Sequence, residues 1–164
     1  MYNQQTSPNK SAGRNGQKPE AIILHVCDGA FEGSLNWLTN PRSMVSAHFL
    51  ISKKGEVIQL VDPKDTAWHA GVVKNPTWKL LKKNLNPNSY TIGIELAGFA
   101  YEKPSQAQIW ATGRLVRELA MQYNITIDGD HIIPHRWING GKTCPGYNIN
   151  VDVITYLALL PLDS

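Results

Sequence analysis

The sequence predicts an α/β (α+β) fold in which a central mixed β-sheet is flanked by helices. Three observations lead to this prediction. Short apolar runs of strand length recur between turn residues, two longer segments show helical spacing, and the two kinds of segment alternate only loosely along the chain. The chain has 164 residues, which is enough for one domain with a hydrophobic core.

The predicted strands are short and apolar, and turn-forming residues separate them. The run Ala21 to Leu24 delivers His25 at its carboxyl end, and Glu95 interrupts an otherwise apolar run near the middle of the chain. The turn Lys53 to Glu56 separates two of the runs and predicts a hairpin. The predicted strands are 21–24, 45–51, 57–61, 90–96 and 132–133.

The clearest predicted helix covers residues 105–123. Its apolar residues recur at helical spacing, and Ser105 can cap its first turn directly after Pro104. A short helix is expected at 34–38 and a closing helix at 151–160.

The domain prediction is a flexible N-terminal arm, residues 1–19, followed by one folded domain, residues 20–164. The arm is polar and rich in Asn, Gln, Lys, Ser and Gly. Residues 62–90 form a long irregular segment. Such segments are commonly disordered or functional, and Trp68 and His69 favour a functional one.

Composition argues against two broad classes of protein. The net charge is +3 without a long Lys/Arg run, so we expect no nucleic-acid partner. No stretch approaches the roughly 18 apolar residues that span a bilayer, so we expect no membrane insertion. Residues 1–20 lack the apolar core of a signal peptide, and we expect synthesis in the cytoplasm.

Three side chains form a candidate zinc site: His25, His135 and Cys144. His135 and Cys144 lie nine positions apart across a loop rich in Asn and Gly, so their side chains can converge. Two imidazoles and one thiolate match a catalytic zinc site, which keeps its fourth position open. Spacing alone leaves alternatives, because His131 is a rival ligand and a bridge between Cys27 and Cys144 is possible; we interpret Cys27 as a packing thiol.

Five motifs in the right order give the chain a family resemblance. They are Ile22-Ile23-Leu24-His25, the hairpin Val45–Ile51 with Gly55, Ala67–Gly71, Ser89–Glu95, and His135-Arg136 together with Lys142–Gly146. Over residues 21–159 the chain resembles the zinc amidases that include phage lysozyme-type amidases, muropeptide-recycling amidases and peptidoglycan recognition proteins. The resemblance implies a peptidoglycan-recognition-protein-like fold and one Zn²⁺ per chain, bound by the three candidate ligands.

The resemblance also implies roles for other residues. Glu95 stands where many members place the carboxylate that activates water, and Lys142 stands where they place a cation near the oxyanion. His69 matches a residue that lines the substrate groove. Phage lysozyme-type members have a tyrosine where this chain has Ala47, which indicates the branch that uses the glutamate.

Two tryptophans are further substrate-binding candidates. Trp68 and Trp137 lie in loops flanking the candidate site, where their flat rings can contact a sugar or a peptide; anchoring of the loops is the alternative interpretation.

The function expected from this set is zinc-dependent hydrolysis of the amide between N-acetylmuramic acid and L-alanine in bacterial peptidoglycan. We expect a monomeric, bacteriolytic hydrolase of the endolysin type that acts on the cell wall and lyses the host if phage-encoded. The alternatives are a cytoplasmic amidase that recycles soluble muropeptides and a non-catalytic peptidoglycan-binding protein. Cys144 favours an enzyme, because non-catalytic relatives typically lack the metal-binding cysteine.

Overall fold

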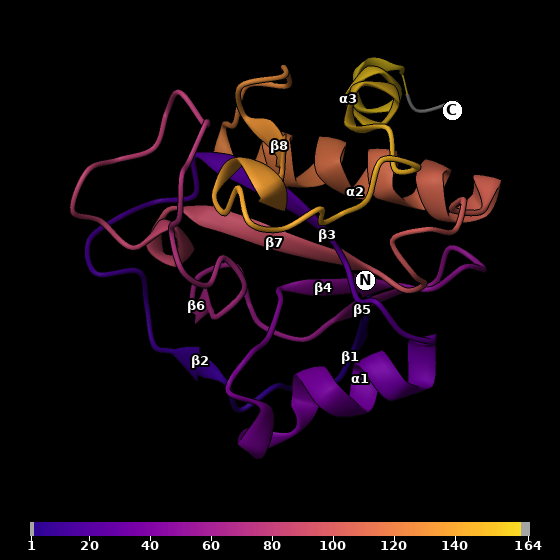
Figure 1. Cartoon of the computed structure of the whole chain (residues 1–164), viewed down its shortest axis with the longest axis horizontal. Helices are drawn as coiled ribbons and strands as arrows, with labels where there is room; N and C mark the ends of the chain where they lie inside the picture. Colours follow the sequence, from indigo (N-terminus) through magenta and orange to yellow (C-terminus); the bar gives the residue numbers. More distant parts are fainter. Residues whose placement is uncertain (1, 162–164) are drawn as a thin grey trace.

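The computed structural model describes residues 2–161 and is organised around one mixed β-sheet (Figure 1). Among these residues the sheet has six strands in the order β1-β5-β4-β7-β3-β8. Their bounds are β1 Asn3–Gln4, β3 Ala21–Val26, β4 Phe49–Ile51, β5 Val57–Gln59, β7 Thr91–Leu96 and β8 Ile132–Pro134.

Strand β3 lies between two parallel neighbours, β7 and β8, and its register with β7 places His25 beside Glu95. Strand β4 runs parallel to β7 and antiparallel to β5, which confirms the hairpin prediction. A two-stranded antiparallel sheet, β2 (Lys10–Ser11) with β6 (Thr66–Ala67), lies beside the main one. The mixed-sheet fold class is therefore confirmed.

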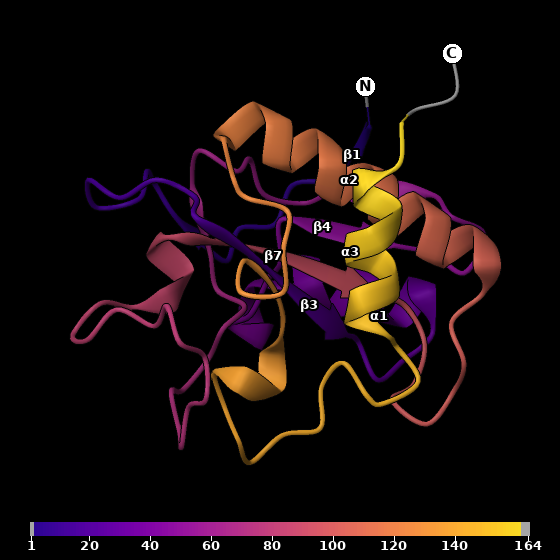
Figure 2. The ribbon, with the colours of Figure 1, turned by 90° about the horizontal axis from the view of Figure 1, so that it is seen from above.

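Helices cover both faces of the main sheet (Figures 1 and 2). Helices α2 (Gln106–Tyr123) and α3 (Val151–Leu159) pack together on one face, and α1 (Phe31–Thr39) lies on the other. Ser105 caps α2 as expected, because its side chain accepts a hydrogen bond from the Gln108 backbone N–H. No helix within residues 2–161 has the length and apolar character needed to cross a bilayer.

The alternation of side chains along β3 separates the core from the polar site. Ile22 and Leu24 point into the apolar cluster beneath α2 and α3. Ile23 belongs to a second cluster on the opposite face, and His25 follows it with the same period of two. Consecutive residues of the strand therefore point alternately into the core beneath α2 and α3 and to the face that carries His25.

The expected flexible arm differs from what the structure shows. Residues 2–19 lie against the domain: β1 pairs with β5, β2 pairs with β6, and Ser7, Asn9 and Arg14 are buried. The polar composition that suggested flexibility is satisfied by hydrogen bonds to distant backbone. For example, the Asn9 side chain donates to the carbonyls of Asn40 and Val45, at 2.8 Å each.

Arg14 is the most deeply connected residue of this segment. Its guanidinium donates to four backbone carbonyls at 2.6 to 3.3 Å, those of Pro63, Asn88, Ser89 and Thr91. These carbonyls belong to both ends of the long irregular segment and to the start of β7. Arg14 therefore connects the N-terminal segment to the loops that approach the candidate site.

Replacement of Arg14 by Ala should lower the free energy of unfolding by about 2–4 kcal/mol, because the buried carbonyls lose a charged donor. Urea unfolding followed by tryptophan fluorescence measures the loss. Lys18→Ala is the matched control: Lys18 is exposed in the same segment, and its removal should cost less than about 0.5 kcal/mol. Equal effects of the two substitutions would contradict the assigned role of Arg14.

Candidate active site

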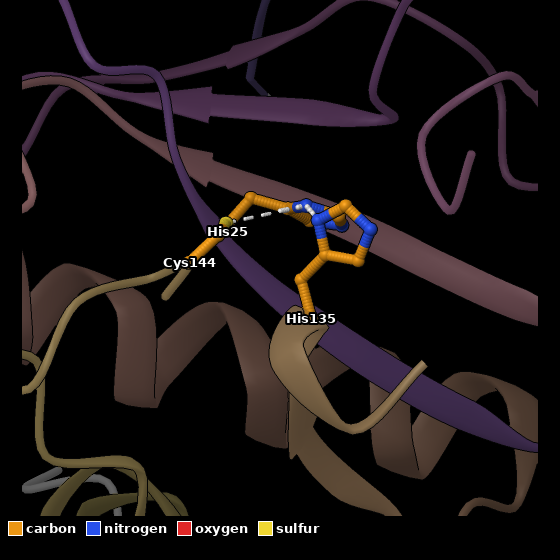
Figure 3. A group of neighbouring side chains, drawn as sticks. All are labelled: His25, His135 and Cys144. Atoms are coloured by element: carbon orange, nitrogen blue, oxygen red, sulfur yellow. Dashed lines mark hydrogen bonds between the residues drawn. The ribbon is translucent and has the colours of Figure 1, made fainter. Parts of the chain in front are cut away.

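The structure brings the three predicted metal ligands together at the carboxyl end of β3 (Figure 3). His25 lies on β3, His135 begins the 3₁₀ helix that follows β8, and Cys144 comes from the loop beyond it. The two Nδ1 atoms are 3.1 Å apart, and the Cys144 Sγ atom is 3.9 Å from His25 Nδ1. All three ligand atoms lie within 4.8 Å of one another.

Hydrogen bonds orient both imidazoles for metal binding. His135 Nε2 is 2.9 Å from the Ala70 carbonyl, which can only accept, so Nε2 carries the proton and Nδ1 presents a lone pair. His25 Nε2 is 3.1 Å from His69 Nδ1; donation there leaves the His25 Nδ1 lone pair facing that of His135. Two nitrogens bound to a tetrahedral zinc lie about 3.3 Å apart, so the donor set fits the ion.

Burial keeps the imidazoles neutral, which is the form that ligates metals. It lowers the pKa of His25 well below the ordinary value, and it lowers the pKa of His135 in the same direction. Burial also raises the pKa of the Cys144 thiol to about 12, and the nearby Glu95 carboxylate adds to this shift. The thiol therefore binds a metal as a thiolate only when a cation lies beside the sulfur. The Val26 N–H also donates to the Cys144 Sγ atom, at 3.5 Å.

Glu95 lies next to the ligand group on the neighbouring strand. Its Oε1 atom is 4.0 Å from His25 Nδ1, and its side chain is 14 % exposed. Burial raises the pKa of the carboxyl to about 7, against the lowering effects of a Cys27 hydrogen bond and of the Lys142 charge. Within residues 2–161 its Oε2 atom has no hydrogen-bond partner, which is costly for a purely structural carboxylate.

A cleft of about 690 Å³ opens over this group. Among the predicted site residues, Lys142, Trp68 and His69 line it together with Glu95 and the ligands. Trp37 of α1 also lines it and was missed. The helical spacing could have indicated it, because Ser34, Trp37 and Leu38 lie three and four positions apart and therefore share one helical face. In the structure all three border the cleft.

Two other predicted side chains lie elsewhere. Trp137 does not border the cleft; it packs against the cluster that contains Ile23 and Ile133, as in the loop-anchoring alternative. His131, the rival ligand, is outside the group, and its Nδ1 atom is 2.6 Å from Asp128 Oδ1. Cys27 and Cys144 are both free thiols, so the alternative of a bridge between them does not apply.

His69 and His48 form a buried layer beneath the ligands. His69 lies between His25 and Thr91, whose Oγ1 atom is 3.4 Å from His69 Nε2. The His48 ring meets the His69 ring edge-on at 5.5 Å, and its Nδ1 atom accepts the Gly93 N–H at 3.0 Å. His69 thus touches a ligand directly, whereas His48 supports His69.

The profile of the N-acetylmuramoyl-L-alanine amidase family (Amidase_2) matches residues 15–147, which is well over half of the chain. The chain belongs to this family. The amidase profile spans β3, β7 and all three ligand positions, so the family assignment rests on the segments that build the site.

Named relatives agree with this assignment. N-acetylmuramoyl-L-alanine amidase A of Achromobacter lyticus is 34 % identical over 128 residues, 76 % of this chain and 63 % of the relative. The 1,6-anhydro-N-acetylmuramyl-L-alanine amidase AmpD of Haemophilus influenzae is 32 % identical over 123 residues, 71 % of this chain and 63 % of the relative. The chain thus spans less than two thirds of either relative.

A solved structure shows the same fold. The crystal structure of a selenomethionine AmpD derivative superimposes with a TM-score of 0.79 at 23 % identity, covering 95 % of this chain and 93 % of that one. The likeness confirms the amidase-type architecture of sheet and helices.

Gly93 makes room for His69 beneath the ligands, and this gives a test of the packing. A methyl group at position 93 would lie 2.4 Å from His69 Cγ and 2.5 Å from Nδ1, so Gly93→Ala should displace the ring. We expect a loss of about 1–3 kcal/mol in the free energy of unfolding, measured with urea. Gly33→Ala is the control: a methyl there meets no atom within 4 Å, and alanine should stabilise α1 by up to about 1 kcal/mol. A destabilisation at both sites, or at neither, would contradict the packing argument.

Proposed function

We propose that this chain is a zinc-dependent N-acetylmuramoyl-L-alanine amidase that hydrolyses the bond between N-acetylmuramic acid and L-alanine in bacterial peptidoglycan. The observation that carries the proposal is the convergence of His25, His135 and Cys144 beside the buried Glu95 at the floor of one cleft. Membership of the amidase family supports the choice of bond.

The metal ligands in the proposal are His25, His135 and Cys144, which hold one Zn²⁺. Zinc, when bound, supplies Lewis-acid polarisation of the substrate carbonyl and lowers the pKa of water. His69 and the Ala70 carbonyl accept the remaining ring protons of the two histidines and keep both Nδ1 atoms directed at the ion.

Glu95 is the proposed proton carrier. Its carboxylate faces the cleft floor next to His25, where it can take a proton from the attacking water and deliver it to the leaving amine of L-alanine. Proton transfer by a positioned group typically contributes about 10²–10⁴-fold to the rate.

Lys142 is the proposed partner of the negative charge that develops on the carbonyl oxygen. It is exposed at the cleft wall, two residues before Cys144, and its charge affects Glu95 and both histidine ligands. Loss of one such donor commonly costs on the order of 10²–10³ in turnover. Trp68, with a half-buried ring at the cleft wall, and His69 complete the proposed substrate-binding set.

A second candidate is a cytoplasmic amidase that recycles soluble muropeptides; the Haemophilus influenzae relative is named for a 1,6-anhydro-N-acetylmuramyl-L-alanine substrate, which supports a soluble muropeptide as substrate. A non-catalytic binding protein is disfavoured, because Cys144 and Glu95 are both present in one site. We retain three further parts of the proposal: a single catalytic domain, predicted over residues 20–164 and completed by the N-terminal residues that pair with its sheet; action on the cell wall after synthesis in the cytoplasm; and a monomeric state.

Digestion of purified cell walls tests the proposed reaction. Incubation should release new N-terminal alanine without new reducing sugar, because the bond cut is an amide and not a glycosidic bond. Prior treatment with a chelator should abolish the release, and added Zn²⁺ should restore it. Activity that survives complete metal removal would refute the zinc mechanism. Release of reducing sugar would show that the enzyme is a glycosidase and not an amidase.

The division of roles is tested by three matched substitutions. Cys144→Ala should reduce bound zinc from about one per chain to near zero, because one of three ligands is lost. Glu95→Gln should keep the zinc and lower turnover by roughly 10²–10⁴-fold. His131→Ala is the control and should keep both, since His131 lies outside the ligand group. Zinc is measured by elemental analysis and turnover by amine release; a Glu95→Gln protein with a near-normal rate would remove Glu95 from the mechanism.

A further inference from the structure

A second hollow of about 490 Å³ adjoins the catalytic cleft. The two share Asp28, Ala100 and Thr143 in their walls, so they lie directly beside each other. The walls that belong to the hollow alone are mainly aromatic: Phe99, Tyr101 and Tyr147. The mechanism proposed above uses none of these three rings.

The loops that carry these rings are held in place by their backbone. The connection after β7 carries Phe99 and Tyr101, and the connection into α3 carries Tyr147; both lie at the same end of the molecule (Figures 1 and 2). Gly146, at φ +88°, approaches Ala100 so closely that a methyl group there would lie 2.4 Å from the Ala100 carbonyl oxygen. The hollow is therefore preformed between two touching loops.

Side-chain contacts hold the same loops together. The Asn148 amide donates to the Tyr101 carbonyl at 2.8 Å, and the Ala100 N–H donates to the Asp28 carboxylate at 3.2 Å. Asp28 directly follows Cys27 at the end of β3, so the hollow is connected to the strand that carries His25.

The aromatic rings are arranged as an exposed platform. Phe99 and Tyr101 stack with centroids 5.4 Å apart and an interplanar angle of 15°, yet Tyr101 is 76 % exposed. Tyr147 is 79 % exposed, and the Arg136 guanidinium lies 5.2 Å from the centre of its ring. Both tyrosine rings are thus oriented by a neighbour while most of their surface faces solvent.

We propose that this hollow is a saccharide subsite that binds the sugar next to the muramic acid whose amide is cut, an assignment that rests on the proposed amidase function. Flat rings with exposed faces suit the apolar face of a pyranose. Charge separates the sugar from the peptide stem as occupant. Asp28 is the one charged side chain among the residues that line the hollow, since Arg136 lies against the Tyr147 ring but outside the lining. The negative charge of Asp28 disfavours the carboxylates of the stem and tolerates an uncharged N-acetylglucosamine.

Two substrates with the same peptide stem test the subsite: a single-sugar muramoyl peptide and a four-sugar glycan fragment whose stem is on an interior muramic acid. The wild-type protein should have a higher kcat/KM on the longer substrate. Tyr101→Ala and Tyr147→Ala should each lower the ratio of the two kcat/KM values by about three- to tenfold, since each removes one stacking surface. Tyr101→Phe should retain the ratio, because it keeps the ring. Tyr156→Ala, at an exposed tyrosine of α3 that lines neither depression, is the matched control.

A binding measurement separates failure of the subsite from failure of the amidase proposal. The stem-free tetrasaccharide of alternating N-acetylglucosamine and N-acetylmuramic acid is titrated into the wild-type and Tyr101→Ala proteins and followed by NMR. Binding that Tyr101→Ala weakens supports the subsite even if no amide is cleaved. Cleavage with an unchanged ratio in both tyrosine variants would overturn the subsite and leave the amidase intact. A loss that follows stem length instead of sugar number would assign the hollow to the peptide and also overturn the proposal.

Discussion

The parallel pairing of β3 with β7 is the constraint on which the site depends. The register that places His25 beside Glu95 also places Leu24 beside Ile94, so both strands have one apolar and one polar face at this end. A slip of one residue would turn His25 or Glu95 toward the core beneath α2 and α3, at the cost of burying a polar or ionisable group there. Burial of the apolar faces therefore determines where the chemistry occurs.

This arrangement puts ionisable groups in a largely water-excluded setting. Burial keeps the imidazoles neutral and raises the pKa values of Cys144 and Glu95. Without a cation, the ligand atoms on the cleft floor therefore lack a favourable electrostatic partner. Electrostatic interactions are stronger in such a medium, which suits both metal binding and the transfer of a proton through Glu95. The groups that orient the ligands, the Ala70 carbonyl and the His69 ring, come from the long segment between β5 and β7.

That long segment has little regular structure of its own, and distant residues hold it. Arg14 binds carbonyls at both of its ends, and the missing side chain of Gly93 leaves the space into which His69 fits. The N-terminal residues are thus connected to the ligands through a short series of packed groups, Arg14, His48, His69 and His25. At the aromatic hollow, the missing side chain of Gly146 likewise lets its loop lie close to Ala100.

The sequence by itself determined the elements whose signals are local. The apolar runs predicted the strands, the spacing and the Ser105 cap predicted α2, and the chemistry of His25, His135 and Cys144 with their motifs predicted the ligand group. Spacing alone could not exclude His131 as a metal ligand, because the number of residues between two positions does not determine the direction in which a loop turns.

Only the tertiary structure decided which side chains face the cleft. Trp68 and Trp37 line it while Trp137 packs away from it, and Arg14 is buried although the residues on either side of it in the sequence are exposed. The physical reason is the same in each case. These positions are determined by contacts between residues dozens of positions apart, and the neighbouring residues in the sequence do not indicate such contacts.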